Sequence, residues 1–214
     1  MDTPTEFYQT LRKAVRQAEA LLWGVPEHGS ITKLHHIRVQ SFLLMTHAAI
    51  EQYLEELGEA AALKARKRYK GKGHISKTLL ALITSNSIKR NIEGISYVEN
   101  LSDISVGIEE SSKNACTAYV MLCKKNNGIK SKDQKALLLP VGVDPSQVDP
   151  VVFNGLNTLG THRGDIAHKF MVIRSEHTAN SIRGELRTLT EGLIGYDQAV
   201  CEALGIGMGT TEFA

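Results

Sequence analysis

Long apolar runs are missing from this 214-residue sequence, and so is the chemistry of an export signal. No stretch approaches the roughly 20 consecutive apolar residues that a membrane-spanning helix needs. The first residues include Asp2, Pro4 and Glu6, whereas a signal peptide begins with a basic segment that leads into an apolar one. We therefore expect a cytoplasmic protein that has no membrane partner.

Cysteine and net charge are also scarce. The three cysteines are Cys116, Cys123 and Cys201, and the closest two have six residues between them, which fits neither a CxxC redox motif nor a zinc knuckle. No metal-ligand spacing, nucleotide-binding glycine loop or hydrolase motif is present, so we expect no metal and no cofactor. A net charge of +2 does not indicate a nucleic-acid partner by itself, and such an argument must rest on a local patch.

Helical periodicity is what the sequence does have, over nearly its whole length. Apolar residues recur at steps of three and four, with turn and capping residues between the segments. The pattern predicts an all-α protein with one domain over residues 1–204 and a flexible glycine-rich tail over 205–214. Helices are expected at 5–23, 31–69, 75–85, about 88–98, 108–125, from 131 to a stop at Pro140, 150–160 and 175–204, with turns over 141–149.

Capping residues mark where three of these helices begin. Thr3 precedes Pro4 and is the expected cap of the first helix, and Ser30 or Thr32 is expected to cap the second. Asp149 before Pro150 should begin the helix over 150–160.

The helix over 31–69 carries an apolar stripe with two polar residues at its edge. His47 and Glu51 are four apart and therefore neighbours on one face. They form either an ordinary pair at the border of a core face, or a site into which Glu51 reaches to position another side chain. The expected stripe consists of Leu34, Ile37, Ser41, Leu44, Ala48 and Leu54.

Basic residues gather at the end of that helix, where Gly71 and Gly73 are expected to break it. Such a cluster suits a phosphate backbone because each cation neutralises a phosphate and releases counterions. It is equally typical of a solvated helix end that complements the helix dipole. The residues expected to contact RNA are Lys64, Arg66, Lys67, Arg68, Lys70 and Lys72, together with Lys169 further along the chain.

The densest set of charge and proton chemistry lies in residues 161–169. Arg163 brings a permanent cation that can clamp a phosphate, and His168 brings a group that titrates near neutral pH. Phosphate-ester chemistry is one interpretation, and a solvated arginine with an ordinary histidine is the other. Residues five apart on a straight helix are separated by roughly 140° around its axis, so a shared site needs either a bend at Gly164 or a second chain.

The order of these features resembles the HEPN superfamily, in particular its RiboL-PSP-like branch. The resemblance rests on the acidic residue in an early long helix, Glu51, and on the late Arg-x4-His motif from Arg163 to His168. It implies a HEPN-like helical bundle with long antiparallel helices and short accessory helices. It further implies a metal-independent endoribonuclease of a toxin–antitoxin or phage-defence system, which acts on RNA as a homodimer with a composite active site.

In that reading Arg163, His168 and Glu51 are the catalytic residues, and His47 supports them. The family pattern often has a polar residue such as asparagine after the arginine, where this chain has Gly164. Asp165 or His162, which lie nearby, could take the place of that polar residue. The competing readings are a non-catalytic helical module that binds RNA, an antitoxin or a nuclease partner, and a plain structural helical protein.

Overall fold

The computed structural model describes residues 4–27, 31–89, 101–168 and 178–207. All regular structure within these ranges is helical, which confirms the predicted all-α class. None of the described helices is long and apolar enough to cross a membrane. The elements are α1 (Glu6–Ala18), η1 (Glu19–Leu22), α2 (Lys33–Lys72), α3 (Lys77–Lys89), α4 (Leu101–Lys125), α5 (Ser131–Leu138), η2 (Leu139–Val141), α6 (Pro145–Val148), α7 (Pro150–His168), α8 (Ala179–Gly192) and α9 (Ile194–Leu204).

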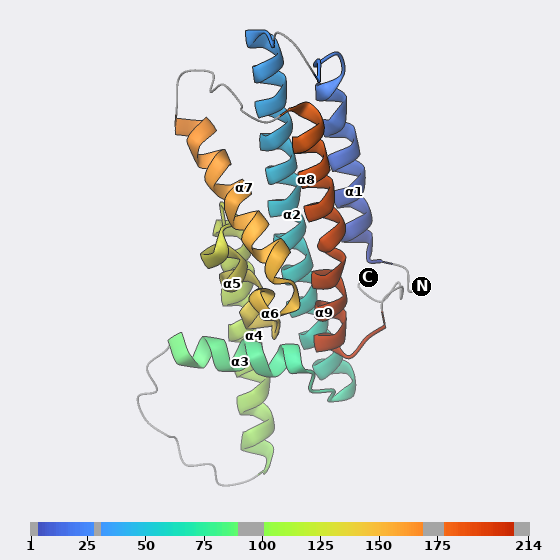
Figure 1. Ribbon diagram of the computed structural model, residues 1–214. Coiled ribbons are helices and arrows are strands. Elements are labelled where there is room, and N and C mark those ends of the chain that lie inside the picture. The colour runs from blue at the N-terminus through green and yellow to red at the C-terminus, as the bar shows by residue number, and fades with distance from the viewer. Residues whose placement is uncertain (1–3, 28–30, 90–100, 169–177, 208–214) are drawn as a thin grey trace.

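The 40-residue helix α2 is the scaffold against which most other elements pack. Figure 1 shows α1, α2 and the consecutive helices α8 and α9 running along the length of the molecule, with α3 crossing at the lower end. Helices α5 and α7 pack against α2 and against each other. This arrangement brings side chains of α2, α5 and α7 together in the middle of the molecule.

The buried face of α2 differs from the predicted stripe over the first part of the helix, although Leu54 of that stripe is fully buried. The core side chains are Phe42, Ile50, Tyr53 and Leu57, each 2% exposed or less. Leu34 and Ile37 of the expected stripe are 55% and 41% exposed. The helix has two apolar stripes, and only packing against α1, α4 and α9 decides which one enters the core.

Helix α7 begins as expected and ends later than expected. The Asp149 carboxylate accepts hydrogen bonds from the backbone N–H groups of Val151 (2.9 Å) and Val152 (3.0 Å), which is the predicted cap. The helix does not end at Gly160 but continues through Gly164 to His168. The helix is unbroken at Gly164, which has no left-handed backbone, so nothing in these two features supports the bend considered at this residue.

Five smaller features also differ from the sequence prediction. Thr5, not Thr3, caps α1, since its side chain accepts from the Tyr8 N–H. The helix from 75 continues to Lys89, and α4 begins at Leu101, while the helix expected near 88–98 lies largely outside the described residues. The turns expected over 141–149 include the short helix α6. The last helix is divided in two at Leu193.

A buried carboxylate joins the first and last described helices. Asp197 on α9 is fully buried and accepts hydrogen bonds from the Thr5 N–H (2.9 Å) and the Thr5 hydroxyl (2.5 Å). The Tyr53 hydroxyl of α2 lies 3.3 Å from the same carboxylate. Burial raises the pKa of Asp197, while the hydrogen bonds from Thr5 and Tyr53 favour its ionised form. The contact ties α1, α2 and α9 into one core.

Candidate functional site

Three helices bring titratable side chains to one place. Helix α2 carries His47, Glu51 and Glu55 at successive turns, and helices α5 and α7 carry Asp133 and Arg163. The charges of Arg163 and Asp133 both act on His47 and on Glu51. The predicted trio of Glu51, His47 and Arg163 therefore comes together between α2 and α7.

His47 is inside the protein, not at the edge of a core face as the sequence indicated. It is 2% exposed, and its Nδ1 atom lies 3.7 Å from Glu51 Oε2, which is too long for a hydrogen bond. Burial, reinforced by the positive charge of Arg163, lowers the pKa of His47 to about 4. His47 is consequently neutral near pH 7, and the contact is not an ion pair there.

Glu51 is partly buried, with 19% of its side chain exposed, and its two oxygens differ. Oε2 faces His47, whereas Oε1 is buried and has no hydrogen-bond partner among the described residues. Burial and the neighbouring Glu55 carboxylate raise the pKa of Glu51, although Arg163 opposes this shift. A buried acceptor without a donor is costly, so this oxygen is suited to hold a donor from a ligand or from Arg163.

Two members of this cluster, Glu55 and Asp133, were not foreseen from the sequence. The Asn126 side-chain amide donates to Glu55 Oε1 (2.8 Å), which ties the end of α4 to α2. Asp133, the third residue of α5, accepts from the N–H of the N-cap residue Lys130 (3.1 Å). The continued i, i+4 spacing from Glu51 could have revealed Glu55. No local signal could have revealed Asp133, because α5 reaches α2 only through tertiary packing.

The other residues of the 161–169 motif divide into two groups. His162 and Arg163 are half-buried, and Asp165 is exposed. The side chain of His168 and the whole of Lys169 lie outside the described residues. Because α7 is continuous, positions 163 and 168 lie roughly 140° apart around its axis.

The basic cluster at the end of α2 is separate from this site. Lys64 and Lys72 follow Glu51 by 13 and 21 residues, a distance of roughly 20 to 30 Å along a helix. The helix continues through Gly71, and Gly73 in the left-handed conformation ends it. Within one chain, the predicted RNA-contacting residues of α2 and Arg163 therefore do not form a single site.

A model of the family described as RiboL-PSP-HEPN matches residues 28–202 of the chain. The chain belongs to this family. No curated protein and no solved structure matches it. The match includes α2 and α7 and thus all the side chains described above.

The RiboL-PSP-HEPN match confirms the resemblance that the sequence indicated. Domains of the HEPN superfamily are often ribonucleases, and a nucleotide-binding role is also consistent with the match. The described part of the chain contains no group of three or more His, Cys, Asp and Glu side chains that could hold a metal ion. The chemistry that the chain itself offers here is a guanidinium, Arg163, whose charge acts on a carboxylate of raised pKa, Glu51.

Proposed function

We propose that the chain is a metal-independent endoribonuclease of a toxin–antitoxin or phage-defence system. The observation that carries the proposal is a buried Glu51 Oε1 without a partner among the described residues, on a carboxylate that the charge of Arg163 reaches across the α2–α7 packing. A cation and an unused acceptor that α2 and α7 bring to one region suit a phosphodiester flanked by a ribose hydroxyl. Membership of the RiboL-PSP-HEPN family supports the same reading.

The proposed reaction is an internal transesterification of RNA. A 2′-hydroxyl loses its proton and attacks the adjacent phosphorus, the P–O5′ bond breaks, and the departing 5′-oxygen takes up a proton. The products are a 2′,3′-cyclic phosphate and a free 5′-hydroxyl. His168 of the motif would transfer protons, and Arg163 would stabilise the charged phosphorane. Glu51 would orient Arg163 from the α2 side, with neutral His47 packed behind it.

We further propose that the active enzyme is a homodimer. Positions 163 and 168 lie on different sides of α7, so a second copy is needed for one cleft to contain both residue types. The apolar stripe that α2 leaves exposed offers a surface for that copy. Its large side chains are Leu34, Ile37 and Met45, which are 55%, 41% and 53% exposed.

The decisive experiment is RNA cleavage in the presence of EDTA. We expect the wild type to cut single-stranded RNA to products with a cyclic phosphate end. Arg163→Ala and His168→Ala should each lower the rate at least about 100-fold, the scale of losing one charge-stabilising or proton-transferring group. Arg12→Ala, which removes an exposed arginine from α1, is the matched control and should cut normally. Circular dichroism melts would verify that all variants are folded.

The second candidate is a non-catalytic module that binds RNA, an antitoxin or a nuclease partner. It is favoured by the Gly164 position, where the family pattern often has a polar residue. Salt-dependent RNA binding without cutting in EDTA would support the module. Cutting at the wild-type rate by purified His168→Ala would rule out the proposed mechanism. Toxicity on expression that His168→Ala relieves would support the nuclease.

A further inference from the structure

The basic cluster at the end of α2 separates into two faces with different surroundings. At 100° per residue, Arg66 and Lys70 lie on one face of the helix, and Lys64, Lys67, Arg68 and Lys72 lie on the other. Arg66 Nη2 and Lys70 Nζ lie 3.6 and 3.8 Å from Glu109 Oε1 of α4. The Glu109 carboxylate of α4 thus partly neutralises the positive charge of the first face.

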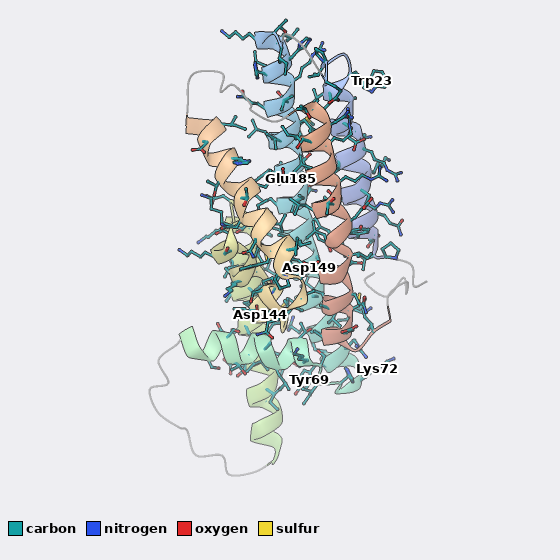
Figure 2. All side chains as sticks on the ribbon, viewed as in Figure 1. Trp23, Tyr69, Lys72, Asp144, Asp149 and Glu185 are labelled. Carbon is teal, nitrogen blue, oxygen red and sulfur yellow. The ribbon has the colours of Figure 1, made fainter. Side chains whose placement is uncertain are left out.

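The second face lines an open groove, and none of the described residues in its wall is acidic. Its lining consists of Lys64, Lys67, Arg68, Gly71, Lys72, Gly73, His74 and Ile75. Figure 2 shows Lys72 at the lower end of α2 and Tyr69 near α3, and Tyr69 packs against the core. Lys67 and Lys72 of this groove are exposed and Lys64 is half-buried, and no aromatic ring belongs to its described lining.

Arg68 is fixed in the groove by the end of the last described helix. Its Nη1 donates to the carbonyl oxygens of Leu204 and Gly205, the carbonyls that α9 leaves unpaired at its C-terminus. Gly205 has a left-handed backbone (φ 69°) and closes α9 beside His74. One wall of the groove is thus held rigidly by α9.

Helix-dipole compensation does not account for this set of cations. That effect is confined to the last turn of a helix, where Lys70 and Lys72 lie. Lys64, Lys67 and Arg68 precede that turn. Lys64, Arg68 and Lys72 instead form a row with a rise of roughly 6 Å per step, which suits a run of backbone phosphates.

We propose that this groove is an RNA-backbone site, separate from the Arg163 site, and that the preferred substrate is an RNA long enough to occupy both. An acidic protein is a weaker fit because protein interfaces depend on buried apolar anchors, and Ile75 is the one large apolar side chain in the lining. That both sites hold the same RNA rests on the proposed nuclease function.

The geometry sets a minimum length for such a substrate. The groove lies roughly 20 to 30 Å from Glu51 along α2 and about a third of a turn away around it. At about 6 Å per nucleotide of an extended single strand, the spacing of the row itself, an RNA needs at least roughly four to six nucleotides to connect them. A dinucleotide can therefore enter only one of the two sites.

The test separates binding in the groove from cleavage. We would measure fluorescence anisotropy of a labelled 2′-O-methyl RNA 30-mer, which cannot cyclise, over a range of salt concentrations. The triple variant Lys64→Gln, Lys67→Gln, Lys72→Gln should bind about tenfold or more weakly, with a log–log salt slope smaller by about 2, because each lysine contributes about 0.7 on a single strand. The matched control Lys13→Gln, Lys113→Gln, Lys124→Gln removes the same charge from exposed positions and should bind within twofold of wild type.

Cleavage assays then distinguish a failure of this inference from a failure of the nuclease proposal. The groove variant should cut a dinucleotide normally and a 30-mer at least about tenfold more slowly at limiting RNA. If the protein binds RNA through the groove but cuts neither substrate, the groove is supported and the nuclease proposal fails. Wild-type affinity and salt slope in the groove variant would overturn the inference. So would displacement of the 30-mer by polyglutamate as readily as by RNA of equal charge.

Discussion

His47 gives the protein a pH dependence that can be traced to one residue. In the unfolded chain its pKa is near 6.5, whereas in the folded protein burial and Arg163 lower the pKa to about 4. As the pH falls from 6.5 to 4, the unfolded chain takes up a proton that the folded protein does not. The free energy of unfolding should therefore fall by about 3 kcal/mol through this group alone, and by no more below pH 4.

Urea denaturation at several pH values would measure this effect. His47→Gln should flatten the curve between pH 4 and 6.5, and His74→Gln, at an exposed histidine, should leave it unchanged. Glu51 acts in the opposite direction because burial raises its pKa, so the net slope of the wild type is smaller than the contribution of His47. Equal slopes for wild type and His47→Gln would show that His47 titrates alike in both states.

At the scale of the helix, Gly58 of α2 and Gly164 of α7 make a matched pair for replacement by alanine. Both lie inside helices, where replacing glycine by alanine gains about 1 kcal/mol of helix propensity. A Cβ at Gly58 would overlap the Tyr119 hydroxyl, which donates to the Leu137 carbonyl across α4 and α5. A Cβ at Gly164 would meet nothing within 4 Å.

We therefore expect opposite results from the same substitution. Gly58→Ala should lower the free energy of unfolding by about 2 kcal/mol, since overpacking and a lost buried hydrogen bond outweigh the propensity gain. Gly164→Ala should raise it by roughly 0.5 to 1 kcal/mol. Urea midpoints of the two variants measure the difference. A Gly58→Ala protein as stable as wild type would show that Tyr119 can move without cost.

Helices could be predicted from the sequence more reliably than the surfaces they bury. The 3.6-residue period, the caps Thr32 and Asp149 and the helix breaker Gly73 predict where α2 and α7 lie to within a few residues. The end of α7 is the exception. The stripe of Leu34 and Ile37 has the same period as the true core face, so periodicity alone could not choose between them. Burial is decided by partners that are remote in the sequence.

The same limit applies to the candidate site. The pair His47 and Glu51 could be recognised because the two residues are neighbours on one helix. Their proximity to Arg163 followed only from the family resemblance, since more than 100 residues separate them. The sequence did not indicate that the charge of Asp133 acts on Glu51, because this effect depends on how α5 packs against α2.

At the scale of the whole molecule, the proposed dimer can be tested through its apolar surface. Ile37→Glu combined with Met45→Glu places charge on the exposed stripe of α2, and we expect it to convert a dimer into a monomer in sedimentation experiments. Cleavage should fall at least about 100-fold, because a composite site loses one of its halves. The fold should persist, since both side chains are largely exposed.

The control for this prediction changes apolar side chains elsewhere. Leu80→Glu combined with Leu139→Glu alters residues that are 56% and 44% exposed on α3 and η2. It should leave the sedimentation coefficient and the cleavage rate as they are in the wild type. A wild-type protein that is monomeric and cuts RNA at a rate proportional to its concentration would contradict the dimer.

The Asp197 carboxylate has a consequence for synthesis on the ribosome. Chains emerge from their N-terminus, so Thr5 and Tyr53 are made long before their acceptor on α9. Until residue 197 leaves the exit tunnel, α1 and α2 lack the contact that joins them to α9. A nascent chain can therefore complete this part of its core only after α9 has emerged.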